Sequence, residues 1–168
     1  MRLINSFTLV QHLGEYEQWP LATEVLLDGQ ASGKQIPGYV IEAQYAHDNY
    51  YLLVTSWDCP FEEAQTFVLL SHDLNVLDKK TIGAAYSSVW LQGHEPQGEN
   101  AVMFHCDGDL DVLATILPKG KLSLSKFERS TGERLQTSMF DWRKLPLLKF
   151  GAVVLILWLW VEGAIMFF

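Results

Sequence analysis

The stretch AVMFHC-DG-DLDVLATIL, residues 101–117, decides the fold class of this chain. Two runs with strand-forming residues, Ala101–Cys106 and Asp109–Leu117, lie on either side of Asp107-Gly108. An Asp-Gly pair between two such runs favours a type I′ turn, because both central residues of that turn need a positive φ. The stretch therefore predicts an antiparallel β-hairpin.

Working outward from this hairpin, the same pattern of short β-rich runs around polar turns recurs along the chain. The paired runs are Tyr39–Tyr45 with Tyr50–Trp57, Thr66–Leu70 with Val76–Lys80, and Lys121–Arg129 with Glu133–Phe140. Ser6–Leu13 and Leu21–Leu27 are two further candidate strands, whereas Gly29–Gly38 and Gly93–Asn100 have the composition of surface connections. We predict an all-β domain over residues 1–140, an antiparallel meander, sandwich or barrel of about nine to ten strands.

Charge is distributed unevenly along the 168 residues, whose net charge is −8. Residues 1–118 carry a net charge of −12, residues 119–149 carry +5, and residues 150–168 carry −1. The hydrophobic fraction of 49% excludes a disordered chain. The acidic body argues against nucleic acid as a partner, because nucleic-acid binding needs a basic face.

Residues 150–168 form the most apolar segment and predict a C-terminal transmembrane helix. As a helix, this segment would be about 28 Å long, close to the roughly 30 Å thickness of the hydrocarbon core. Residues 141–149 form a basic neck, in which Arg143, Lys144 and Lys149 flank the apolar segment. The positive-inside rule then predicts a single-pass tail anchor with a cytoplasmic N-terminal domain and with membrane lipids around the tail. A soluble all-β protein with a buried C-terminal helix is the alternative.

Glu162 is the ionisable residue of the apolar segment, and Trp158 lies one helical turn before it. Ionisable groups within membrane spans usually face a partner or a water-filled cavity. Glu162 and Trp158 are therefore candidate intramembrane contacts with another membrane protein. A carboxyl group that is protonated or reaches the far surface is the alternative interpretation.

No catalytic or cofactor motif emerges from the sequence. Asp109 and Asp111, beside His105 or Asp107, suggest a weak cation site, but the spacing does not fit an EF-hand loop. The histidines do not have metal-binding spacing, and the chain has no Cys-x-x-Cys motif. We therefore predict no metal, no cofactor and no enzymatic activity. The expected function is a scaffold or accessory subunit of a membrane complex, with a membrane-anchored small-ligand-binding barrel or sandwich as the alternative.

Overall fold

A computed structural model describes residues 1–59, 63–83 and 88–135 of the chain. The all-β prediction is confirmed, because the described residues form three antiparallel sheets and a single 3₁₀ turn, η1 (Tyr16–Gln18). The basic neck at 141–149 and the apolar segment at 150–168 lie outside the described residues. No helix within the described ranges is long and apolar enough to span a membrane.

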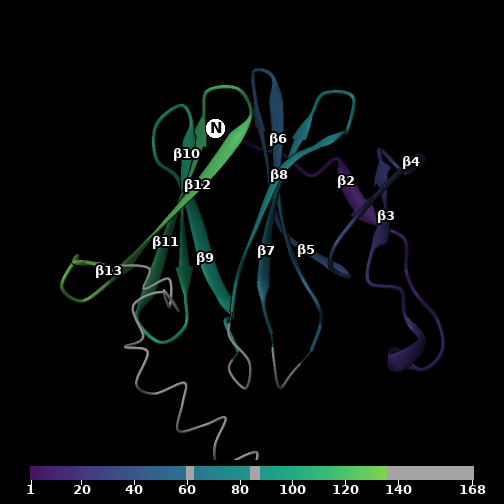
Figure 1. Cartoon of the computed structure of the whole chain (residues 1–168), viewed down its shortest axis with the longest axis horizontal. Coiled ribbons are helices and arrows are strands. Elements are labelled where there is room, and N and C mark those ends of the chain that lie inside the picture. Colours follow the sequence, from purple (N-terminus) through teal and green to yellow (C-terminus); the bar gives the residue numbers. More distant parts are fainter. Residues whose placement is uncertain (60–62, 84–87, 136–168) are drawn as a thin grey trace, which may run out of the picture. The chain divides into compact units, whose positions relative to one another are not determined.

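The three sheets contain thirteen strands in the described part of the chain (Figure 1). The central sheet has the order β1 (Arg2–Leu3), β5 (Val40–His47), β6 (Tyr50–Ser56), β7 (Gln65–Ser71), β8 (Val76–Ile82). The second sheet has the order β13 (Arg134–Leu135), β12 (Lys121–Glu128), β11 (Leu110–Leu117), β10 (Ala101–Cys106), β9 (Leu91–Pro96). The third sheet has the order β2 (Phe7–Leu9), β3 (Thr23–Leu27), β4 (Gln30–Ile36).

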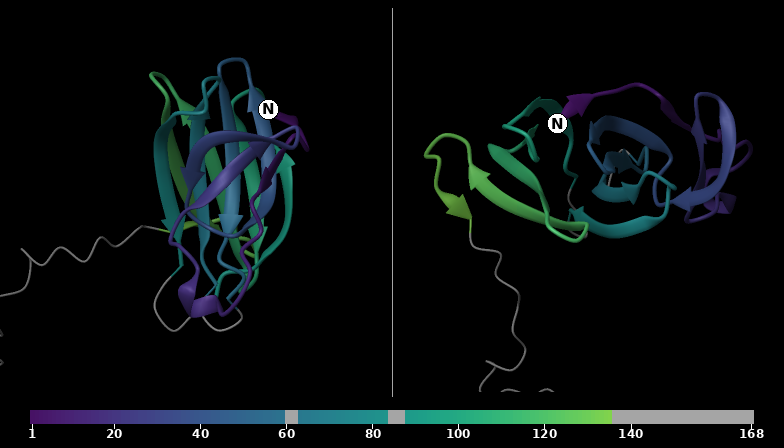
Figure 2. Two further views of the ribbon diagram at one scale, coloured as in Figure 1. Left: turned by 90° about the vertical axis from the view of Figure 1, so that its right-hand side faces the viewer. Right: turned by 90° about the horizontal axis from the view of Figure 1, so that it is seen from above.

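The central sheet is covered on both faces, so residues 1–135 contain two hydrophobic cores. One core joins side chains of the central sheet, such as Leu52 and Phe67, to Phe104 and Val112 of the second sheet. The other core lies on the opposite face and joins residues such as Leu53 to Phe7, Val25 and Ile36 of the third sheet. Figures 1 and 2 show the second and third sheets on opposite sides of β5–β8. The three sheets are therefore stacked face to face.

The sequences of β6 and β7 explain why the central sheet is covered twice. Their residues form continuous apolar runs, and positions 52–56 and 65–70 are all buried. Successive side chains of a strand point to opposite faces, so a strand that is buried along its length needs a partner layer on each side. A strand with one solvated face, such as β8, alternates or is largely exposed instead.

Five details of the sequence-based prediction need correction. The first is the number of strands, which is thirteen in the described residues rather than about nine to ten. The expected connection at Gly29–Gly38 contains strand β4, which pairs with β3 around the positive φ of Gly33. The expected connection at Gly93–Asn100 begins inside β9, which pairs with β10. The expected strand Ser6–Leu13 ends at Leu9, because residues 10–22 leave the sheet as a loop. The type I′ geometry of the opening hairpin lies at Gly108 and Asp109, one residue later than predicted.

The differences at β4 and β9 have a common reason. Backbone pairing with a neighbouring strand stabilises β4 and β9 even though their side chains are polar, and single-segment patterns do not reveal the neighbour. The remaining predicted hairpins, β5–β6, β7–β8 and β12–β13, are present in antiparallel register.

Candidate functional site

The β10–β11 hairpin carries the residues that the sequence suggested for a weak cation site. Its turn contains Asp107, Gly108 and Asp109, and the register pairs His105 with Asp111. Alternation along β10 turns Cys106 into the core and His105 to the opposite face of the second sheet. The sequence therefore placed His105 and Asp111 correctly on one face.

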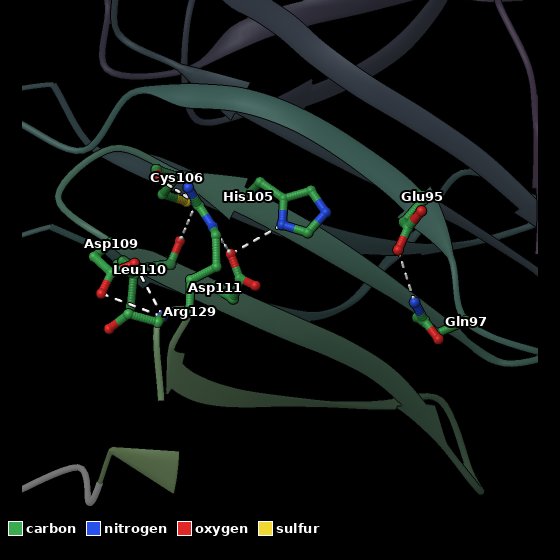
Figure 3. Close-up of polar contacts among 9 residues, drawn as sticks. Glu95, Gln97, His105, Cys106, Asp109, Leu110, Asp111 and Arg129 are labelled. Atoms are coloured by element: carbon green, nitrogen blue, oxygen red, sulfur yellow. Dashed lines mark hydrogen bonds and ion pairs between the residues drawn. The ribbon is translucent and has the colours of Figure 1, made fainter. Parts of the chain in front are cut away.

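The carboxylate of Asp111 is engaged by two side chains, as Figure 3 shows. His105 Nδ1 lies 2.9 Å from Asp111 Oδ1, and Arg129 Nε donates to the same oxygen at 2.7 Å. Arg129 Nη2 also donates to the carbonyl oxygens of Cys106 and Leu110, at 2.5 and 3.2 Å. We call His105, Asp111 and Arg129 the Asp111 cluster. Through these hydrogen bonds, Arg129 links the end of β12 to both strands of the β10–β11 hairpin.

Protonation in the Asp111 cluster follows from these contacts. Burial by itself raises the pKa of Asp111, but hydrogen bonds from Arg129 and His105 outweigh burial, so the pKa lies below its usual value. The hydrogen bond to Asp111 raises the pKa of Arg129 in turn. Asp111 is thus an anion whose charge is already compensated by a guanidinium group.

This arrangement does not fit the cation site that the sequence suggested. The carboxylate of Asp111 already binds the guanidinium of Arg129. The carboxylate of Asp109 accepts hydrogen bonds from the backbone N–H of Ser130 at 3.1 and 3.3 Å. Among the described residues, no group of three or more His, Cys, Asp and Glu side chains is placed to hold a metal ion. The Asp111 cluster therefore acts as a cross-link between strands rather than as a ligand set.

The nearest thiol is not placed to react with the Asp111 cluster. Cys106 is fully buried on the other face of the sheet, and burial raises the pKa of its thiol to about 11. A buried protonated thiol is a poor nucleophile. Both described cysteines, Cys59 and Cys106, are free. The hairpin thus offers a histidine held by a carboxylate but no nucleophile beside it.

Glu63 is a second buried carboxylate and has a different environment. Its Oε1 atom accepts hydrogen bonds from the backbone N–H of Trp57 at 2.7 Å and of Ala64 at 3.0 Å, and its Oε2 atom accepts from Cys59 N–H at 2.8 Å. Val89 N–H donates to its carbonyl oxygen at 2.8 Å. The Glu63 side chain therefore links residues that follow β6 to the residues before β7. Its backbone carbonyl oxygen binds the segment before β9.

A polar pair links the first core across the two sheets. Tyr45 of β5 contacts His94 of β9 through a hydrogen bond of 2.5 Å between the tyrosine hydroxyl and His94 Nδ1. Burial raises the pKa of Tyr45 and lowers the pKa of His94, so both side chains are neutral at neutral pH. The pair satisfies two polar groups inside the core and fixes the position of β9 against β5.

Aromatic rings gather where the loop between β2 and β3 meets the central sheet. The ring centroid of Tyr39 lies 5.1–5.6 Å from those of His12, Tyr16, Trp19 and Trp57. The Tyr16 hydroxyl donates to the Trp57 carbonyl oxygen at 2.9 Å, and burial is the main reason that the pKa of Tyr16 rises to about 12. We call these five residues the aromatic cluster. Edge-to-face packing of this kind holds rings in defined positions.

The backbone before β5 positions Tyr39 for this packing. Gly38 has a φ of +98°, and a Cβ atom there would lie 2.7 Å from the Cβ atom of Thr55. Thr55 donates a hydrogen bond to the Pro37 carbonyl oxygen, and Thr23 donates to that of Gly38, both at 2.7 Å. Only glycine fits this close approach, which directs the next residue, Tyr39, toward the 10–22 loop.

A hollow with a volume of about 650 Å³ lies near the paired strands β1 and β5. Its walls are largely polar and include Arg2, His47, Asp48, Tyr51, His72 and Glu99. Charges of both signs line it, and the hollow is open to solvent rather than enclosed. It is not the closed apolar cavity that a barrel for an apolar ligand would contain.

The sequence-predicted site residues have separate outcomes. Arg143, Lys144, Lys149, Trp158 and Glu162 lie outside the described residues, and their roles stay predictions. Glu63, His94 and the aromatic cluster were not predicted from the sequence. The partner of His94 and the members of the aromatic cluster come from separate segments of the chain, so no spacing rule signals them. The donors to Glu63 lie within six residues of it, but they are backbone N–H groups, which every residue type except proline carries. Comparison of the chain with protein-family models, with curated proteins and with solved structures finds no match.

Proposed function

We propose that this protein is a tail-anchored interaction protein. Residues 150–168 hold it in a membrane with residues 1–149 in the cytoplasm, and the β-sheet unit binds a protein of the same membrane complex as a scaffold or accessory subunit. The observation that carries the proposal is the order of the sequence: an acidic body, a basic neck at 141–149 and an apolar segment. This order is typical of a cytoplasmic domain that is followed by a membrane anchor.

The chemistry of the described residues supports binding rather than catalysis. The buried polar side chains described above mostly contact other groups of the protein: Asp111 contacts Arg129, Glu63 contacts backbone N–H groups, and Tyr45 contacts His94. An active site would instead direct such groups toward a substrate. The β-sheet unit presents exposed loops on a scaffold of paired strands. This is the usual form of a binding module.

Membrane fractionation tests the anchor. We expect the full chain to sediment with membranes, to resist extraction by high salt and carbonate, and to dissolve in mild detergent. A chain that ends at Lys149 should remain in the soluble fraction. If the full chain stays soluble without detergent, the anchor is wrong. A stoichiometric protein that co-purifies in mild detergent would support the interaction role.

Binding of a small ligand to the β-sheet unit is the second candidate function. The open hollow near His47 and His72 is the observation in its favour. Its mixed charges favour a small polar ligand over an apolar one. Thermal shift of the purified chain against polar metabolites would detect such a ligand, and replacing His72 with alanine should remove the shift.

A further inference from the structure

The loop between β2 and β3, residues 10–22, exposes apolar side chains to an unusual degree. Leu13 is 90% exposed and Leu21 is 81% exposed, the two highest values among the large hydrophobic side chains of the described residues. Leu21 also lines a groove of about 500 Å³ with Pro37, Val76 and Leu77. The same groove also contains Gln35, Asp78 and Lys79, so its walls are partly polar. Isolated exposed leucines are common, but two on one loop, one of them in a groove, indicate a contact surface.

Contacts at the base of the loop bring its two arms together. Val10 N–H donates to the Glu24 carbonyl oxygen at 3.0 Å, and His12 Nε2 lies 2.9 Å from Thr23 Oγ1. Leu13 follows His12 directly, and Leu21 precedes Thr23 by two residues. The two leucines are therefore close to the same cross-loop contact, so one partner segment can cover both.

Ring packing within the aromatic cluster holds the 10–22 loop in place. Tyr16 and Trp19 pack against each other at 5.2 Å between ring centroids, and both pack against Tyr39, the residue before β5. Tyr16 still exposes 40% of its surface. Aromatic residues that are held in place before binding are typical hot spots, because little conformational entropy is lost on association.

The charge around the loop identifies the chemistry of the partner. Residues 3–33 contain four carboxylates, Glu15, Glu17, Glu24 and Asp28, and no lysine or arginine. Glu15 and Glu17 are exposed within the loop, on either side of Tyr16. An anionic rim attracts a cationic partner and repels anionic lipid headgroups.

We propose that the 10–22 loop is a docking surface for a segment of a partner protein that is rich in lysine or arginine and carries aliphatic side chains. The aliphatic side chains cover Leu13 and Leu21, and cationic side chains pair with Glu15 and Glu17 and lie against the exposed ring of Tyr16. This inference deepens the proposed function and rests on its interaction role, because it names the surface and the chemistry of the partner.

The test uses the full chain in a non-ionic detergent and measures fluorescence anisotropy of labelled peptides. The probe is a twelve-residue peptide of lysine and leucine, and the comparison peptide has glutamate in place of lysine. We expect the lysine peptide to bind and to lose affinity as salt rises. The double variant Leu13→Ser, Leu21→Ser should weaken binding by about tenfold or more, because it removes most of the apolar contact.

Two further variants separate charge from nonspecific adsorption. Glu15→Gln with Glu17→Gln should weaken binding of the lysine peptide and flatten its salt dependence. The control, Leu117→Ser with Leu135→Ser, removes exposed leucines from the second sheet and should leave binding unchanged. All substituted side chains are exposed, so the circular dichroism spectrum and the melting temperature should match those of the unsubstituted chain.

Three results would overturn the inference: no binding of the lysine peptide, equal binding of the glutamate peptide, or equal binding by the loop variants and the unsubstituted chain. A fourth would replace protein with lipid as the occupant. In that case, a fluorophore at Leu13→Cys, in a Cys59→Ser background, would be quenched by spin-labelled lipid in phosphatidylcholine nanodiscs. The three peptide-binding results do not depend on whether residues 150–168 anchor the chain, and a partner that co-purifies equally with loop variants would leave the proposed function standing.

Discussion

Two regions of the β-sheet unit each bury a carboxylate, and they neutralise it in different ways. In the Asp111 cluster, a carboxylate side chain that is 12% exposed is paired with a guanidinium group and a histidine. In the connection around Glu63, a side chain that is 0% exposed contacts backbone N–H groups instead. The comparison shows that the backbone of a connection can replace a cationic partner when several N–H groups converge on one carboxylate.

The difference has consequences for stability. Arg129 is partly exposed, so after its removal water can solvate the Asp111 carboxylate in its place. The N–H groups around Glu63 depend on that side chain, because Trp57, Cys59 and Ala64 donate to it directly. We therefore expect the Glu63 connection to be the more sensitive of the two regions.

The largest effect is expected for Glu63→Ala. It leaves three backbone donors without their acceptor in a buried place, which should lower the free energy of unfolding by about 3–5 kcal/mol. Glu63→Gln keeps the shape but places an amide N–H₂ among donors, and should cost about 1–2 kcal/mol. Chemical denaturation followed by circular dichroism measures both. The exposed Glu17→Ala is the control, and equal losses for Glu17→Ala and Glu63→Ala would contradict the comparison.

A smaller effect is expected for Arg129→Ala. The substitution removes the charge-assisted hydrogen bond to Asp111 and the contacts to Cys106 and Leu110, and should lower the free energy of unfolding by less than Glu63→Ala does. Arg129→Lys should recover only part of the loss, because lysine lacks the planar fork that reaches three acceptors. If Arg129→Lys recovered the full free energy of unfolding, a positive charge alone would be enough to hold Asp111.

Acid should weaken the Asp111 cluster less than removal of Arg129 does. The pKa of Asp111 is lower in the folded chain than its usual value of about 3.9, so its contribution is present above about pH 4 and is lost as pH falls through the folded pKa. A protonated Asp111 can still accept a hydrogen bond from Arg129. Asp111→Asn should therefore flatten this part of the curve of stability against pH. An unchanged acid limb in Asp111→Asn would assign the limb to other groups.

The smallest effect is expected for His105→Gln. His105 is about one-third exposed and donates a single hydrogen bond to Asp111, so its loss should cost at most about 1 kcal/mol. Chemical denaturation followed by circular dichroism measures this loss. A larger loss than that of Arg129→Ala would mean that His105, rather than Arg129, holds the cluster together.

Much of the fold was predictable from the sequence because it rests on local patterns. The runs that became β5, β6, β7, β8, β10, β11 and β12 have strand-forming composition and are separated by turn residues. Strand β4 was missed, because its residues, QASGKQI, are polar and contain a glycine, and only pairing with β3 makes them a strand. The candidate site was predictable only as the neighbours His105 and Asp111.

The sequence by itself determined an all-β unit, the position of its main hairpins, and the order of acidic body, basic neck and apolar segment. Strand composition, turn chemistry and charge are properties of neighbouring residues, so they can be found without coordinates. Other features became known only from the folded chain: the central sheet is covered on both faces, Arg129 meets Asp111, and Leu13 and Leu21 remain exposed. These depend on which distant segments pack together, and that choice is made by the burial of apolar surface over the whole unit.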